Sequence, residues 1–130
     1  MIISRSPFRV SFAGGGSDIK EYFLNYGGSV LSSTINKYVY LSMHPYFNSN
    51  KILLKYSKNE LVESPDKINH KIIRQIFLDF KINGIDFNSS ADIPAGTGLG
   101  SSSAFTCALI KLCSEFQNKI ISKSEIASMA

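Results

Sequence analysis

The sequence predicts an α+β domain, and three observations carry this prediction. β-Branched and aromatic residues typical of strands occur near the N-terminus, at 29–46 and again at 85–93. Two stretches, at 70–80 and 99–116, instead repeat apolar residues at the spacing of a helix. The resulting order of strands, helix, strands, helix, strand, loop and helix is typical of an α+β fold. A length of 130 residues is enough for one domain with a core.

The N-terminal segment is predicted to be a strand followed by a short helix. "RVSFA" (9–13) with its flanks is β-branched and aromatic, and the glycine-rich residues after it interrupt the strand. Asp18 is then predicted to cap a helix over 19–26, which Gly27 and Gly28 end. The helical spacing is carried by four apolar residues, Ile19, Tyr22, Phe23 and Tyr26.

The next region is predicted to be an antiparallel hairpin. Segment 29–46 alternates and is rich in Val, Ile, Thr and Tyr, which indicates one long bent strand or two paired strands. "NSN" (48–50) forms a turn, and "KILLKYS" (51–57) is a further strand. This order predicts that the strand at 51–57 pairs with the strand before it.

The C-terminal half is predicted to contain three helices and one strand. Helix 70–80 places Ile72, Ile73, Ile76, Phe77 and Phe80 on one face. A turn at 83–84 leads into the strand 85–93, and a helix from Leu99 to about Phe116 follows a loop. Ser122 is predicted to cap the last helix, with Glu125 in the capping-box position.

Composition excludes several classes of protein. Hydrophobic residues make up 44% and charged residues 18% of the chain, which is typical of a globular rather than a disordered protein. No apolar run is long enough to span a membrane, and the N-terminus lacks a secretory signal, so a cytoplasmic protein without a membrane partner is expected. The net charge is +4, but the lysines are scattered, so no nucleic-acid partner is expected.

The cysteines and histidines do not form a metal site by their spacing. Cys107 and Cys113 lie six apart on one predicted helix and point to different faces, so they are predicted to be reduced core thiols. His44 and His70 have no Cys, His or acidic neighbours at the spacing of zinc ligands.

The most informative stretch is "IPAGTGLGSSSAF" (93–105), a glycine- and serine-rich approach to a helix. A helix N-terminus carries partial positive charge and unpaired N–H groups, and glycines let a phosphate approach them closely. A Walker A loop would need Lys where Ser101 stands, and the glycine spacing does not fit a dinucleotide fingerprint. The alternative is a structural Gly/Ser turn with a serine N-cap.

Pro94 followed by Gly98-Leu99-Gly100-Ser101-Ser102 resembles the central phosphate-binding motif of the GHMP kinases. The family has Ala after the two serines, whereas Ser103 and then Ala104 stand here. A second motif, "SPFRVSFAGGGSD" (6–18), resembles the N-terminal sugar-binding motif of the family. Gly15 and Gly16 replace the Glu-His of galactokinases, and the motif is similar to the branch that phosphorylates heptose 7-phosphate and related fucose-type sugars.

This resemblance implies the binding of ATP and Mg²⁺ at the second motif. The residues implied to surround the ATP phosphates are Pro94, Gly96, Thr97, Gly98, Leu99, Gly100, Ser101, Ser102 and Ser103. Ser102 is the candidate for the Mg²⁺ contact, and the alternative for it is a helix N-cap. Phosphoryl transfer depends mainly on positioning and charge neutralisation, which such a loop supplies.

The N-terminal motif is implied to bind the sugar. Arg9 is the candidate catalytic residue, which steadies the transferring phosphoryl group or polarises the accepting hydroxyl; the alternative is a surface ion pair. The implied substrate-binding residues are Gly14, Gly15, Gly16, Ser17 and Asp18, with a tight turn and a helix N-cap as the alternatives for the glycines and for Asp18. Arg9 and Asp18 are expected to meet the serine loop at one cleft. Asp92 is not taken as the base, because an Asp before such a loop is usually a turn former.

The resemblance covers nearly all of 1–130 and implies the N-terminal, ATP-binding domain of a GHMP kinase. That domain has the ribosomal protein S5 domain 2-like fold, a mixed sheet with helices on one face, here expected to be incomplete at the C-terminus and to lack the C-terminal domain. The implied activity is transfer of the ATP γ-phosphate to a heptose 7-phosphate-type sugar for surface polysaccharide precursors. The alternatives are a fucokinase-like or other sugar kinase and an inactive nucleotide- or sugar-binding remnant. The 130 residues alone are expected to be inactive and prone to association, because residues matching the base and the metal-binding acid are not among them.

Overall fold

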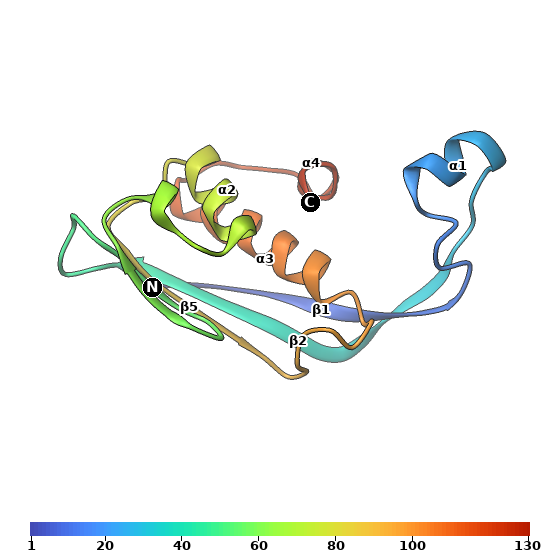
Figure 1. Cartoon of the computed structure of the whole chain (residues 1–130), viewed down its shortest axis with the longest axis horizontal. Coiled ribbons are helices and arrows are strands. Elements are labelled where there is room, and N and C mark those ends of the chain that lie inside the picture. The colour runs from blue at the N-terminus through green and yellow to red at the C-terminus, as the bar shows by residue number, and fades with distance from the viewer.

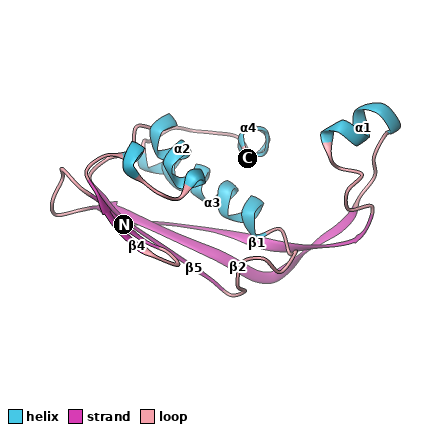
Figure 2. Cartoon of the chain, viewed as in Figure 1, coloured by secondary structure: helices cyan, strands magenta, loops and turns pink.

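The computed structural model describes residues 1–130 as one five-stranded sheet with helices on one face (Figures 1 and 2). The strands are β1 (Ile2–Ala13), β2 (Leu31–Pro45), β3 (Ile52–Lys55), β4 (Asn59–Val62) and β5 (Ile85–Ala91). The helices are α1 (Lys20–Tyr26), α2 (Lys71–Asp79), α3 (Ser101–Phe116) and α4 (Lys123–Met129), with a 3-10 turn η1 (Pro65–Lys67). The α+β class and the mixed sheet predicted from the sequence are confirmed.

The sheet order is β1-β2-β5-β3-β4, and it corrects one expectation about pairing. β2 is one continuous strand that pairs with β1 and β5, both antiparallel. β3 does not pair with β2, as the predicted hairpin required; it runs parallel to β5 and antiparallel to β4, a short strand that the sequence pattern did not reveal. β5 inserts between β2 and β3 because its alternating Ile85 and Phe87 bury their side chains in the core.

The core lies between the sheet and a layer formed by α2 and α3. Phe8, Leu41 and Phe87 of three strands are buried against these helices. The apolar face predicted for helix 70–80 is confirmed, because Ile73 and Phe77 of α2 are fully buried. α3 packs across β1 and β2, and its first turn therefore lies where β1 passes beneath it (Figure 1).

The α1 arm, residues 14–30, stands apart from this layer (Figure 1). No residue of α1 is buried, although its apolar spacing is that of an amphipathic helix. Gly27 ends the helix with a positive φ of 72°, as predicted. The cap prediction for Asp18 is wrong: Ile19 is the N-cap residue, and the Asp18 carboxylate accepts the Gly16 N–H at 3.0 Å within the preceding turn.

Local signals near the C-terminus are confirmed. Ser122 accepts the Glu125 N–H, and the Glu125 carboxylate accepts the Ser122 N–H, so the capping box of α4 is complete. Cys113 is buried in the core, and this burial raises the pKa of its thiol to about 12; Cys107 is half-buried. The structure holds no helix that is both long and apolar enough to cross a membrane.

Candidate functional site: a cleft at the start of α3

The predicted loop leads from β5 to α3 without regular secondary structure. Gly100 is the N-cap residue of α3 and adopts the left-handed conformation, with φ 70° and ψ 28°. The serine N-cap considered for this loop is therefore wrong, and so is the start of the helix at Leu99: α3 begins at Ser101, and no side chain caps it. The three serines occupy its first turn, where backbone N–H groups and hydroxyls lie together at the positive end of a sixteen-residue helix.

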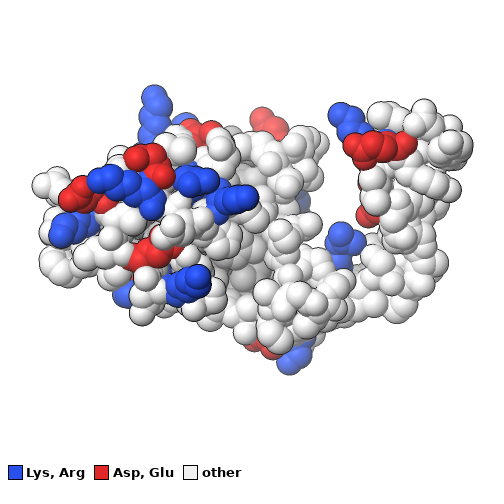
Figure 3. All heavy atoms as spheres, in the orientation of Figure 1, with Lys and Arg blue, Asp and Glu red and all other residues white.

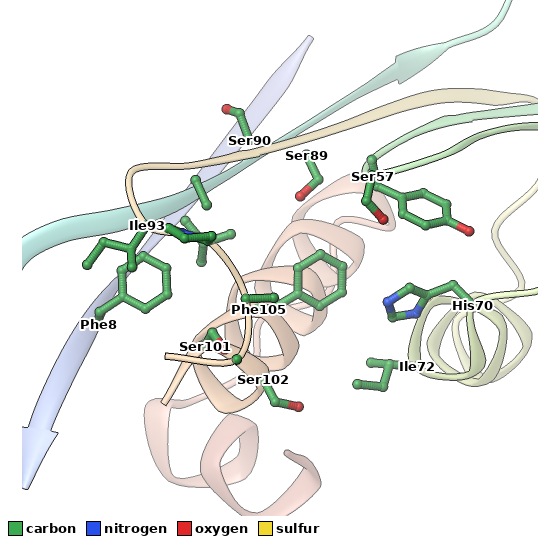
Figure 4. Close-up of a pocket in the computed structure, with 16 residues that line it drawn as sticks. Phe8, Ser57, His70, Ile72, Ser89, Ser90, Ile93, Ser101, Ser102 and Phe105 are labelled. Atoms are coloured by element: carbon green, nitrogen blue, oxygen red, sulfur yellow. The ribbon is translucent and has the colours of Figure 1, made fainter. Parts of the chain in front are cut away.

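A cleft of about 740 Å³ opens beside this first turn (Figure 4). Ser101, Ser102 and the loop residues Pro94 to Gly96 line one end of it. Phe105 lies one helical turn further along α3 and faces His70, which comes from the start of α2 (Figure 4). One end of the cleft is therefore polar and fitted with backbone donors, and the other end is aromatic, a combination suited to a ligand with an anionic part and a flat ring system.

The cleft lining contains no Asp, Glu, Lys or Arg side chain. Positive charge instead comes from Arg9, which lies against the loop from β1. The Arg9 N–H donates to the Leu99 carbonyl at 3.1 Å, and its side chain lies 3.0 Å from the position that a Cβ on Gly100 would take. Its guanidinium donates to the Ser11 hydroxyl at 3.1 Å rather than to a carboxylate, so the surface ion pair considered for it is absent.

The pairing of β1 with β2 changes register next to Arg9. The shift lies between Pro7, which pairs with Tyr38, and Arg9, which pairs with Thr34. Successive side chains of a strand point to opposite faces. Phe8, within the shift, is buried and lines the cleft, while its neighbour Arg9 contacts the loop. Two residues that are far from the loop in sequence therefore reach it from one strand.

The predicted sugar-binding residues lie in the α1 arm, outside the cleft lining. Gly14 and Gly16 adopt positive φ angles of 79° and 99° in the turn that carries Asp18. The Ser17 hydroxyl lies within hydrogen-bond distance of the Gly14 carbonyl (2.7 Å) and the Ser29 carbonyl (3.0 Å). Figure 3 shows an open hollow between the arm and the helix layer. Asp18 forms no hydrogen bond or ion pair with Arg9 or the serine loop, so their convergence on one cleft stays a prediction.

The remaining members of the predicted phosphate motif do not line the cleft. Thr97 donates its hydroxyl to the Pro94 carbonyl at 3.4 Å, which closes the loop on itself. Leu99 and Gly100 instead face β1 through Arg9. Ser103 follows the two serines of the lining on the first turn of α3. The loop thus has one side toward the cleft and one side toward β1.

Asp92, at the start of the loop, has a structural role. Its N–H donates to the Tyr38 carbonyl at 2.9 Å, and its carboxylate accepts the Tyr38 N–H at 2.8 Å. These two bonds continue the pairing of β2 with β5 by one residue and hold the base of the loop. The carboxylate is thereby engaged with the backbone of β2.

The aromatic end of the cleft was not predicted from the sequence. Tyr56 follows β3, His70 caps α2 through its Nδ1, which accepts the Ile73 N–H at 3.4 Å, and Phe105 lies on α3. The Tyr56 and His70 rings meet edge to face at 5.3 Å, and the His70 and Phe105 rings lie 5.5 Å apart. Of these three residues only Phe105 could have been found from the sequence, because it lies two positions after Ser103 of the serine motif. Tyr56 and His70 come from other elements that only the fold brings next to it.

The donor set near the loop fits a Mg²⁺ ion held mainly by phosphate oxygens. Ser102 presents one hydroxyl to the cleft, and no group of three or more His, Cys, Asp or Glu side chains lies close enough together to hold a metal. Mg²⁺ keeps several waters and takes one or two protein ligands plus substrate phosphates in such sites. Ser102 would therefore supply one oxygen ligand to an ion held mainly by the phosphates.

Comparisons with known proteins find similar chains among heptose phosphate kinases. A curated relative, the D-glycero-alpha-D-manno-heptose 7-phosphate kinase of Campylobacter jejuni, is 30% identical over 99% of this chain. The alignment covers 42% of that relative, so the chain spans less than half of its length. A crystal structure of a D-glycero-D-manno-heptose 1-phosphate kinase from Bacteriodes thetaiotaomicron superposes with a TM-score of 0.86 at 26% identity. It covers 99% of this chain and 46% of that one.

Two further solved structures are similar to this chain. A putative sugar kinase from Campylobacter jejuni has a TM-score of 0.77 at 28% identity, covering 98% of this chain and 42% of that chain. The mevalonate kinase of Methanococcus jannaschii, at 23% identity and a TM-score of 0.76, shares the fold; the match covers 98% of this chain and 44% of that one. Residues 66–130, half of the chain, match the family described as GHMP kinases N terminal domain. Together with the glycine-serine loop at the start of α3, this match shows that the chain belongs to the GHMP kinases.

Proposed function

We propose that this chain forms the nucleotide-binding part of an ATP-dependent sugar-phosphate kinase in the cytoplasm. The observation that carries the proposal is the cleft between the serine turn of α3 and the Tyr56–His70–Phe105 rings. Its volume of about 740 Å³ lies within the range of ligand pockets, about 300–1,000 Å³. The triphosphate would lie on the loop and the first turn of α3, and the nucleobase would lie at the aromatic end.

The acceptor is proposed to be a heptose 7-phosphate-type sugar used for surface polysaccharide precursors. In the reaction a phosphorus–oxygen bond to the sugar hydroxyl forms, the bond to ADP breaks, and the hydroxyl releases its proton to a base or to solvent. Arg9 neutralises charge on the transferring group, since it lies against the loop with a fixed positive fork. Mg²⁺, held in part by Ser102, neutralises charge on the phosphates when bound. Gly14 to Asp18 of the α1 arm contact the sugar across the hollow.

Isothermal titration of the 130-residue chain with Mg·ATP tests the nucleotide site. Weak, saturable binding is expected, and Ser102→Ala should weaken it by about tenfold, because one ligand to the metal and one donor to the phosphates are lost. Ser128→Ala, an exposed helical serine of α4 outside the cleft, is the matched control and should change affinity less than twofold. Equal weakening by both substitutions, or no binding at all, would contradict the site.

Activity is tested with the full-length product of the gene that contains these residues. D-glycero-D-manno-heptose 7-phosphate is expected to be phosphorylated in preference to fucose, galactose and mevalonate, and the 130-residue chain alone is expected to match buffer. Arg9→Ala should lower kcat more than it raises KM, since its interaction strengthens in the transition state. Preference for fucose would favour the fucokinase-like alternative, and no turnover of any sugar would favour the inactive remnant.

A further inference from the structure

A second, smaller cavity adjoins the aromatic end of the cleft and shares part of its wall. Its volume is about 420 Å³, and its lining is almost entirely polar. Tyr56, Ser57 and His70 line both cavities. The Tyr56–His70 pair is therefore a partition whose position sets the shape of the cleft at the end opposite the serine turn.

One carboxylate holds both sides of this partition. Glu60 lies on β4, and one of its oxygens accepts a hydrogen bond from the Tyr56 hydroxyl. Its other oxygen accepts two donors of Asn69, the backbone N–H at 2.9 Å and the side-chain amide at 3.0 Å. Asn69 directly precedes His70, so a single side chain fixes the Tyr56 ring and the backbone that carries the His70 ring.

The surroundings of the Glu60 carboxylate fit this holding role. Burial alone would raise its pKa, but the hydrogen bonds from Asn69 and Tyr56 and the nearby His70 outweigh burial and lower the pKa below 4.5. Glu60 is thus the charged acceptor in this network at neutral pH, and hydrogen bonds to a charged acceptor are about twice as strong as neutral ones.

From this juxtaposition we propose that Glu60 is a positioning residue for the nucleobase: it locks Tyr56 and His70 into one aromatic wall for the base. The inference rests on the proposed nucleotide site. Glu60 does not line the larger cleft itself, so its effect passes through Tyr56 and His70. The triphosphate end of the cleft is formed by other elements, the loop and α3, and Glu60 has no contact with them. Loss of the carboxylate should therefore weaken recognition of the base and leave recognition of the phosphates intact.

The test compares Glu60→Gln with Glu63→Gln in the full chain, using ATP and inorganic tripolyphosphate as probes. Glu63 is the matched control because it lies three residues further along the chain, is exposed, and forms an ion pair with Lys67 at 2.8 Å instead of bonds to Tyr56 or Asn69. Glu60→Gln should weaken ATP affinity about tenfold and change tripolyphosphate affinity less than twofold. Glu63→Gln should change neither by more than twofold. Tyr56→Phe, which keeps the ring and removes the hydroxyl, should give a smaller loss for ATP only.

Several results would overturn the inference. An equal loss of ATP and tripolyphosphate affinity in Glu60→Gln would show a general structural effect, and unchanged ATP affinity in both Glu60→Gln and Tyr56→Phe would show that the lock is irrelevant to the base. If the wild type binds tripolyphosphate as tightly as ATP, the aromatic end contributes nothing to binding. If the wild type binds neither probe, the proposed function itself fails, a result distinct from all of these.

Discussion

Helices α1 and α3 both repeat apolar residues at helical spacing, yet α3 is packed in the core and α1 is exposed. α3 buries half of its residues between β1, β2 and α2. α1 buries none, and Tyr26 at its end is 78% exposed. Amphipathic spacing therefore predicts a helix and which of its faces is apolar. Burial of that face requires a partner surface, which the spacing does not specify. In α3 the sheet supplies that surface; in the α1 arm the helix is held from its base instead.

The base of the α1 arm is a stalk formed by residues 14–17 and 27–30. Two glycines allow the backbones of these two segments to come into contact. A Cβ on Gly14 would lie 1.9 Å from the Ser29 carbonyl oxygen, and a Cβ on Gly28 would lie 2.1 Å from the Ser17 carbonyl oxygen. The Ser17 hydroxyl bridges the two segments and also accepts the Ser29 N–H at 3.2 Å. Close backbone contacts therefore hold the α1 arm in position, whereas side-chain packing holds the helix layer on the sheet.

The largest expected difference between the two regions is in stability. Phe87→Ala removes a fully buried ring that meets Phe77 edge to face at 5.9 Å, and it should lower the free energy of unfolding by about 3–5 kcal/mol. Phe23→Ala makes the same chemical change on α1, where the side chain is 41% exposed, and should cost less than about 0.5 kcal/mol. Urea unfolding followed by circular dichroism measures both. Similar costs for the two would mean that Phe23 of the α1 arm is packed as well as Phe87 of β5 in the core.

A smaller effect is expected within the stalk. Gly28→Ala forces a Cβ against the Ser17 backbone and should destabilise the α1 arm by about 1–3 kcal/mol, while Gly15→Ala, whose Cβ would meet only the Ser11 side chain at 4.0 Å, should be neutral. Neither position has a positive φ, so the pair differs in contact and not in backbone strain. Hydrogen exchange should show faster exchange at 14–30 in Gly28→Ala and unchanged exchange in α3. Faster exchange throughout the chain would show that the arm and the helix layer unfold together.

The smallest expected effect is the pH dependence of the Tyr56–Glu60 hydrogen bond, which lies in the sheet and helix layers and not in the α1 arm. Burial and the hydrogen bond to Glu60 raise the pKa of Tyr56 from 10.0 to about 12. A raised pKa in the folded state means that the contact stabilises fully below pH 10 and that this stabilisation is lost as the pH rises toward 12. The stability difference between wild type and Tyr56→Phe should therefore be constant near neutrality and shrink above pH 10. A difference that stays constant up to pH 12 would contradict the raised pKa.

Much of the fold was determined by local sequence. Four features depend on residues within one or two turns of each other: strand β1, the apolar spacing of α2, the glycine end of α1 and the capping box at Ser122 and Glu125. Their physical causes, rotamer and backbone preferences and short-range hydrogen bonds, act before any distant contact forms. The left-handed conformation of Gly100 before α3 has a local cause too, since glycine adopts a positive φ without steric cost.

Tertiary structure decided the features that depend on residues far apart in the sequence, such as the strand order and the composition of the cleft. The sequence predicted that β3 pairs with its neighbour β2, but the sheet places β5 between them, because strand pairing is settled by which apolar faces share one core. Capping was misplaced at Asp18 and at the serines because a shift of one or two residues in the helix start changes which group faces the free N–H groups. The Tyr56–His70–Phe105 wall comes from three elements, and Arg9 reaches the loop from a fourth. The sequence by itself thus determined the chemistry of the loop, while only the fold decided which side chains stand opposite it, because that choice is made by long-range packing.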